Sequence, residues 1–107
     1  MKIYISGQIS GLPLHEARLN FAEAEKWLKG QGYEVMNPMV CNVYEEWKTW
    51  VDYIIESIEA LRECDGIYFM DNWVNSDGAE IEKIVAEHLE LKVIEHGVSG
   101  AVRLVET

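Results

Sequence analysis

Apolar residues along the chain follow two spacings. Short runs rich in β-branched and aromatic residues, each closed by a turn-forming residue, are typical of strands. Longer stretches carry apolar residues three and four positions apart, which is typical of amphipathic helices. These patterns predict strands over residues 2–6, 33–36, 66–70 and 91–95, a weaker edge strand over 101–105, and helices over 14–31, 44–62 and 78–88.

The alternation of strand and helix predicts the architecture. Strands joined by helices form a parallel sheet with helices on both faces, because each crossover returns the chain to the same end of the sheet. We therefore expect a three-layer α/β/α fold with a parallel, four- to five-stranded sheet of the flavodoxin or Rossmann-like kind. Such sheets bind ligands outside the carboxyl ends of their strands. The loops to inspect are then residues 7–13, 37–47 and 71–78.

Length and charge narrow the choice of function. With 107 residues the chain fits one domain over residues 1–107. The formal net charge of −10 disfavours nucleic acids and anionic membranes as partners, although a few backbone N–H groups could still hold a small phosphorylated ligand. No apolar run approaches a membrane span and no signal sequence is recognisable, so we expect a cytoplasmic protein.

Cysteines and histidines give no sign of a metal site. The two cysteines, Cys41 and Cys64, form no CxxC pair, so neither a disulfide framework nor a metal cluster is expected. His15, His88 and His96 share no ligand spacing and adjoin no cysteine cluster. We therefore expect a protein without a metal or other cofactor.

The first loop could bring the backbone close to a ligand. Gly7 and Gly11 allow conformations and close approaches that other residues resist, so the N–H groups around Gln8 and Ile9 could contact a phosphate or a ribose. The loop matches neither the GxGxxG pattern nor the P-loop. A plain turn into the following helix explains the same glycines equally well.

The third loop leads into a helix whose first turns carry the candidate chemistry. Ser76 or Asp77 is expected to cap this helix, and the small Gly78 and Ala79 leave room for a ligand against its start. Glu82 follows about one turn later and leans back toward the loop, because helical side chains point toward the N-terminus. The alternative is that these acidic residues only favour the positive end of the helix dipole.

A glutamate at position 82 has a concrete chemical use. A carboxylate can attack the anomeric carbon of a ribosyl group, or stabilise an oxocarbenium-like transition state, as in glycosidases. An acid that protonates the departing base is needed as well, and Asp71 and Asp77 are the candidates.

Four segments together resemble the nucleoside 2-deoxyribosyltransferase-like superfamily, in particular a small domain-of-unknown-function subfamily of it. They span residues 2 to 95 in order. The segments are Ile3-Tyr4-Ile5-Ser6-Gly7, Asn37-Pro38, Cys64-Asp65-Gly66-Ile67 and Trp73-x-x-Ser76-x-Gly78-Ala79-x-x-Glu82.

The resemblance implies an activity and roles for several residues. It makes Glu82 the nucleophile, places Asp71 near the leaving base, and makes Tyr4 and the loop over residues 7–11 part of the site. It implies cleavage of the N-glycosidic bond, or transfer of a (deoxy)ribosyl group, on a nucleoside or nucleotide. It also implies a homo-oligomer, a dimer or larger, in which a neighbouring subunit completes the pocket.

Further side chains could contact a ligand of this kind. Trp47 and Trp73 could stack on a nucleobase. Asn37 could meet ribose hydroxyls, although an ordinary turn before proline explains it as well. Arg18 and Lys48 could reach into the site from neighbouring segments.

Two other functions stay open. A binding module would hold a nucleotide or a related metabolite in the same pocket without turning it over. The short chain motivates this alternative, as do Gln8 and Ile84, which stand where the superfamily commonly has proline and glycine. A purely structural protein would instead leave Glu82 exposed on a convex surface.

Overall fold

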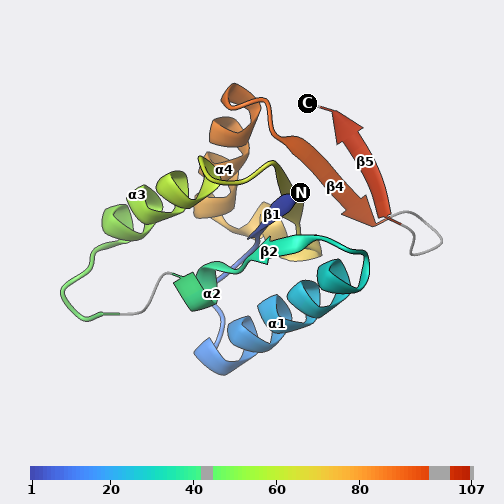
Figure 1. The fold of residues 1–107 in the computed structure, drawn as a ribbon. Coiled ribbons are helices and arrows are strands. Elements are labelled where there is room, and N and C mark those ends of the chain that lie inside the picture. Colours follow the sequence, from blue (N-terminus) through green and yellow to red (C-terminus); the bar gives the residue numbers. More distant parts are fainter. Residues whose placement is uncertain (42–44, 97–101, 107) are drawn as a thin grey trace.

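The computed structural model describes residues 1–41, 45–96 and 102–106. The strand–helix alternation predicted from the sequence is confirmed (Figure 1). In chain order the elements are β1 (Lys2–Ser6), α1 (Leu14–Gly30), β2 (Glu34–Met36), α2 (Pro38–Cys41), α3 (Trp50–Leu61), β3 (Gly66–Phe69), the 3₁₀ helix η1 (Asp71–Asn75), α4 (Asp77–His88), β4 (Lys92–His96) and β5 (Val102–Glu106).

The strands form one sheet in the order β2-β1-β3-β4-β5. β1 lies between β2 and β3 and is parallel to both, β4 joins β3 in parallel, and β5 runs antiparallel along the edge. The predicted parallel α/β fold is therefore confirmed, with an edge strand that runs the other way. The chain moves from β1 to β2 on one side, whereas β3 lies on the other side. Folds of this kind place ligands at such a reversal of strand order.

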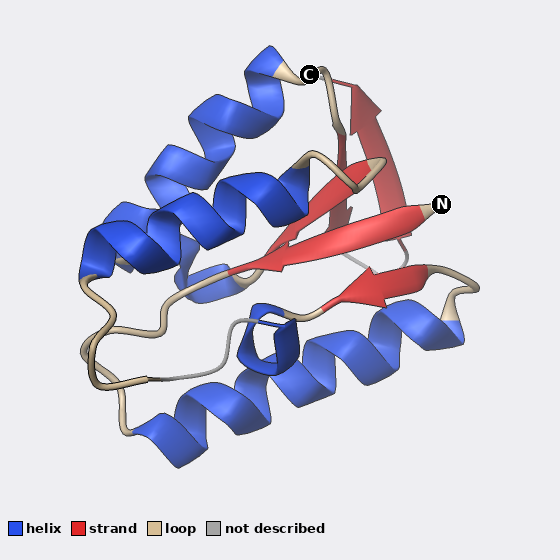
Figure 2. Cartoon of the chain, turned by 60° about the vertical axis from the view of Figure 1, so that its left-hand side comes forward, coloured by secondary structure: helices blue, strands red, loops and turns tan. Residues whose placement is uncertain are grey.

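Helices cover both faces of the sheet (Figure 2). Side chains of a strand alternate between the two faces, so neighbouring residues of β1 enter different clusters. Ile3 and Ile5 lie in a buried apolar cluster with Phe21 of α1. Tyr4 lies in a second cluster with Leu61 of α3 and with residues of α4. The three layers are thus α1, the sheet, and the α3–α4 pair.

The helix predicted over residues 44–62 begins later than the sequence pattern indicates. α3 starts at Trp50, because Thr49 and Asp52 form a capping box. The Asp52 N–H donates to Thr49 Oγ1 at 3.3 Å, and the Thr49 N–H donates to Asp52 Oδ2 at 2.7 Å. Trp47 therefore lies in the turn before the helix. Residues 42–44, where the predicted helix started, are outside the described residues.

Two short helices were not predicted. α2 begins directly after Asn37, whose Oδ1 accepts a hydrogen bond from the Met39 N–H at 2.9 Å. Residues 71–75, expected to be a loop, form η1. Of the two predicted caps of α4, the structure uses Ser76, whose Oγ accepts a hydrogen bond from the Ala79 N–H at 3.1 Å. Elements this short carry too little apolar periodicity to be recognised.

Candidate active site

A buried carboxylate, Glu82, lies at the centre of the candidate site. α4 begins at Asp77, and Glu82 follows in its second turn. The side chain points toward the end of β1 and is only 7% exposed. This burial contradicts the convex, exposed position that a purely structural protein would give Glu82.

Three hydroxyl groups surround the Glu82 carboxylate. Tyr4 Oη donates to Glu82 Oε2 at 2.5 Å, and Ser6 Oγ donates to Glu82 Oε1 at 2.7 Å. Tyr4 and Ser6 are two residues apart on β1, so they share the face of the sheet that α4 covers. The Ser57 hydroxyl of α3 approaches the same carboxylate and also acts to lower its pKa. Both oxygens of Glu82 are therefore held by donors from β1.

The surroundings of Glu82 shift its acidity. Burial raises the pKa of Glu82 above its ordinary value of 4.5, and the hydrogen bonds from Tyr4, Ser6 and Ser57 oppose this shift without cancelling it. Neither of the ion pairs formed among the described residues involves Glu82. The ionised carboxylate is thus less stabilised than an exposed one, which makes it a stronger base and nucleophile.

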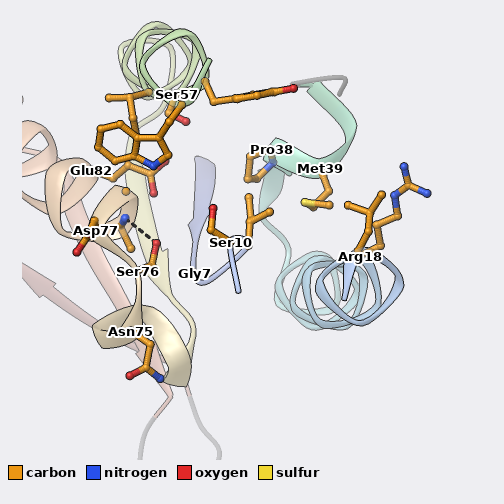
Figure 3. Close-up of a pocket in the computed structure, with 17 residues that line it drawn as sticks. Gly7, Ser10, Arg18, Pro38, Met39, Ser57, Asn75, Ser76, Asp77 and Glu82 are labelled. Carbon is orange, nitrogen blue, oxygen red and sulfur yellow. Dashed lines mark hydrogen bonds between the residues drawn. The ribbon is translucent and has the colours of Figure 1, made fainter. Parts of the chain in front are cut away.

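Glu82 lines a cavity of about 410 Å³. The walls of the cavity come from the first loop, the start of α1, α2, α3 and the start of α4. Figure 3 shows Glu82 and Asp77 on one side of the cavity and Met39 and Arg18 on the other. This volume is within the range of sites that bind small molecules.

The cavity brings together about half of the residues predicted for the site. Those that line it are Gly7, Ile9, Ser76, Gly78, Ala79 and Glu82. Tyr4 is fully buried and reaches the site through its hydrogen bond to Glu82. The other predicted residues are not among the described residues that line the cavity: Gln8, Gly11, Asn37, Trp47, Asp71 and Trp73.

Gly7 marks a close approach between the first and third loops. A Cβ atom at Gly7 would collide with the side chain of Met70 and lie 3.1 Å from Asn72 Oδ1. The Gln8 N–H donates to the same Asn72 oxygen at 3.1 Å, which joins the two loops. Gly11 has a φ of 89°, a conformation that favours glycine. Gln8 and Gly11 therefore shape the loop that borders the cavity.

Asn37 is engaged in holding α2. Its side-chain oxygen accepts the Met39 N–H, and its Nδ2 donates to Glu25 Oε1 at 3.1 Å. Glu25 also forms an ion pair with Lys29 at 2.7 Å, and this contact with Lys29 is the main cause of a lowered pKa of Glu25. Asn37 is 5% exposed, so its visible role is to fix the chain after β2.

The two candidate acids occupy different places. Asp77 lines the cavity beside the start of α4. Asp71 begins η1 and is exposed. Burial raises the pKa of Tyr68, and the negative charge of Asp71 adds to that shift. Because Tyr68 belongs to the cluster on the α1 face, the charge of Asp71 acts on the face opposite Glu82.

The aromatic residues that line the cavity differ from the predicted pair. Trp47 is largely exposed, and Trp73 packs on Phe69 with ring centroids 5.0 Å apart. Trp50 and Tyr53 of α3 line the cavity in their place. Their position follows from the start of α3 at Trp50, which the sequence pattern did not indicate.

Of the two predicted basic residues, Arg18 lines the cavity. Lys48 forms an ion pair with Glu56 at 2.7 Å and lies 5.4 Å from the centre of the Tyr53 ring. Among the described residues, no group of three or more His, Cys, Asp or Glu side chains could hold a metal ion. No helix in this part of the chain combines the length and apolarity needed to cross a membrane.

Two residues close to the Glu82 carboxylate were also missed in the sequence. Ser6 contacts Glu82 directly, and its position two residues after Tyr4 on a strand could have indicated a shared face. Ser57 approaches Glu82 from α3, and it also lines the cavity. No local pattern connects Ser57 with Glu82, because only the packing of α3 against α4 brings them together.

Comparison with known proteins yields a fold and a family. The structure is similar to that of the Clostridium botulinum CMP N-glycosidase BcmB, with a TM-score of 0.58 and 17% sequence identity, covering 89% of this chain and 67% of that chain. At this identity the similarity shows a shared fold. No curated protein matches the chain. Residues 1–95 match the family described as Domain of unknown function (DUF4406), and the chain belongs to this family.

Proposed function

We propose that the cavity binds a nucleoside or nucleotide and that Glu82 breaks its N-glycosidic bond. The observation that carries this proposal is the buried Glu82 carboxylate, which lines a cavity of ligand size and is held by hydroxyl groups of β1. A carboxylate fixed in this way is prepared to attack an electrophilic carbon, because few of its orientations remain to be lost in the transition state.

The comparisons support the proposal at the level of the fold. The similar structure is that of a protein named as a CMP N-glycosidase, and this name denotes an enzyme that cleaves an N-glycosidic bond. Together with the sequence resemblance, this fold supports a place in the nucleoside 2-deoxyribosyltransferase-like superfamily. The single domain, the homo-oligomer and the cytoplasmic location stay predictions from the sequence.

The proposed step balances with the groups at hand. An oxygen of ionised Glu82 forms a bond to the anomeric carbon, and the bond from that carbon to the base nitrogen breaks. The electron pair of the broken bond stays on the base, which takes up a proton from the candidate acid, Asp77 or Asp71. Water or a second base then attacks the anomeric carbon, gives up a proton to that carboxylate, and releases Glu82. Hydrolysis and transfer differ only in this second acceptor.

Asp77 is better placed than Asp71 to protonate the base. Both residues are exposed, but Asp77 lines the same cavity as Glu82, whereas Asp71, at the start of η1, is not among the described residues that line it. The superfamily resemblance favoured Asp71, so the two carboxyl groups are competing assignments. A direct comparison of their variants decides between them.

A second candidate function is a binding module. The observation that favours it is that both oxygens of Glu82 already accept hydrogen bonds, from Tyr4 and Ser6, which makes their lone pairs less available for attack. In this case the cavity would hold the nucleotide intact, and Glu82 would donate or accept hydrogen bonds.

Base release tests the proposal. Wild-type protein and Glu82→Gln are incubated with nucleosides, deoxynucleosides, their monophosphates and NAD, with and without a second base, and free base is measured by chromatography. We expect release by the wild type and a loss on the order of 10³-fold or more in the variant. Glutamine keeps the size and a hydrogen-bond acceptor but cannot form the glycosyl bond.

Two outcomes would count against the enzyme. If the wild type binds panel members, as measured by calorimetry, but releases no base, the binding module replaces the proposed reaction. If Glu82→Gln releases base as fast as the wild type, Glu82 is not the nucleophile. Circular dichroism and thermal unfolding of both proteins show whether the variant is folded.

A further inference from the structure

We propose that Ser57 contacts the 2′ position of the sugar and favours ribosyl over 2′-deoxyribosyl ligands. This inference rests on the proposed function, since it takes Glu82 as the group that faces the anomeric carbon. It concerns the sugar, which neither the fold similarity nor the family identifies.

Two serines lie close to Glu82, but only one of them faces the cavity. Ser6 comes from β1, is 1% exposed and donates to Glu82 Oε1 at 2.7 Å. Ser57 comes from α3 and lines the cavity together with Glu82 (Figure 3). A ligand in the cavity can therefore reach the hydroxyl of Ser57, whereas Ser6 is not among the described residues that line the cavity.

The stereochemistry of nucleosides places the 2′-hydroxyl next to the attacking group. In a β-nucleoside the base projects from one face of the ribose ring and the 2′-hydroxyl from the other. A nucleophile that displaces the base attacks from the face opposite the base, which is the face that carries the 2′-hydroxyl. Cavity-facing groups beside Glu82 therefore lie where the 2′-hydroxyl must be.

The hydrogen-bonding capacity of Ser57 suits this contact. A serine hydroxyl has one donor and two acceptor positions. Tyr4 and Ser6 hold the two oxygens of Glu82, and Ser57 approaches the same carboxylate from α3. It can direct its proton to Glu82 and accept the proton of the 2′-hydroxyl, which links the sugar to the carboxylate. Hydrogen bonds to this hydroxyl strengthen in the transition state of glycoside cleavage.

A matched pair of variants tests the proposal. Base release is measured for a ribonucleotide and its 2′-deoxy counterpart with wild type, Ser57→Ala and Ser6→Ala. We expect Ser57→Ala to lower the ribo-to-deoxy ratio of kcat/KM by about 10-fold, the worth of one hydrogen bond to a neutral group. Ser6→Ala lowers kcat/KM for both substrates by a common factor, because Ser6 acts only through Glu82. The intrinsic reactivity difference of the two sugars cancels in this comparison.

Binding distinguishes failure of this inference from failure of the proposed function. The affinities of the same two nucleotides are measured by calorimetry, which needs no turnover. One outcome is that no base is released, but the wild type binds the ribonucleotide about 10-fold more tightly than its 2′-deoxy form and Ser57→Ala removes this difference. That outcome would support the sugar contact and contradict the proposed reaction. If Ser57→Ala changes both substrates, or both affinities, by one factor, the inference is overturned. If Ser57→Ala does not fold, equal wild-type affinities for the ribonucleotide, its 2′-deoxy form and its 2′-fluoro form overturn it as well.

Discussion

The two faces of β1 use the same strand for different purposes. Ile3 and Ile5 point toward α1 and lie in a cluster whose buried members are almost all apolar. Tyr4 and Ser6 point toward α3 and α4, and both end in hydroxyl groups bonded to Glu82. All four side chains are almost fully buried, at 1% exposure or less. The difference between the faces is therefore one of chemistry and not of burial.

The comparison shows how a small fold can hold a buried charge. A carboxylate without partners inside a protein is costly, because it loses its hydration. The α1 face avoids this cost by burying mainly apolar groups. The α3–α4 face reduces it with donors that alternate along β1, and the cavity admits a ligand to Glu82. Because side chains alternate along β1, one face of the strand packs against α1 and the other face belongs to the candidate site.

Among the substitutions that compare the two faces, the largest effect is expected from the two candidate acids, Asp77 and Asp71. Asp77→Asn should lower kcat/KM for base release by about 100-fold, because a positioned acid contributes roughly that much or more. Asp71→Asn should change it less than threefold, since Asp71 is not among the described residues that line the cavity and its charge acts on Tyr68 of the α1 face. Steady-state kinetics with the most active substrate of the panel measures both. A larger loss from Asp71→Asn would return the acid role to Asp71.

A smaller effect is expected from neighbouring residues of β1. Tyr4→Phe removes a donor that lowers the pKa of Glu82, so that pKa rises further and less of the nucleophile is ionised near neutral pH. We expect kcat/KM to fall about 10-fold at a given pH and its acid limb to move to higher pH. The pH dependence of kcat/KM measures both effects.

Ile5→Val is the matched control for Tyr4→Phe, since it removes one methyl group from the other face. It should cost about 1 kcal/mol of unfolding free energy in urea, within the range of such substitutions. The pH profile of kcat/KM should stay in place. If Tyr4→Phe leaves the profile where it is, or if Ile5→Val moves it, the functional separation of the two faces is wrong.

The smallest effect is a pH dependence of stability. Glu82 has a raised pKa in the folded state, so the stability that protonated Glu82 contributes is complete below 4.5 and is lost as the pH rises through its folded pKa. The glutamine of Glu82→Gln stays neutral at every pH, so the variant does not lose stability in this way as the pH rises. Unfolding free energies measured in urea between about pH 5 and about pH 8 should therefore fall more steeply in the wild type. Glu25 and Asp52, whose pKa values are lowered, act equally in both proteins. Parallel curves for the two proteins would contradict the raised pKa.

Features that depend on local residue spacing could be predicted from the sequence. The strands, the cap at Ser76 and the orientation of Glu82 follow from alternation, helical spacing and capping chemistry, and the structure agrees with them. The predicted start of α3 was wrong because the apolar spacing continues through the turn before Thr49. The helix begins only where Thr49 and Asp52 form the capping box.

The partners of Glu82 could be predicted only in part. Tyr4 was expected at the site, and Ser6 shares its face of β1. Ser57 lies on another helix, and its approach to Glu82 depends on how α3 packs against α4. Asn37 was a natural candidate for ribose, but its side chain is taken up by the start of α2 and by Glu25. Such long-range pairings leave no trace in the spacing of residues.

The junction between Gly7 and Asn72 has a consequence for engineering this protein. A side chain at Gly7 would require Met70 to move, and the Gln8 N–H is bonded to Asn72 across the gap between the two loops. The donor at Gln8 is a backbone N–H, so any residue except proline can keep this bond, whereas replacement of Asn72 removes its acceptor. Libraries that vary Gln8 together with residues 71–75, and keep Gly7, can change the rim of the cavity as one unit. New ligand preferences should be sought by such coupled variation.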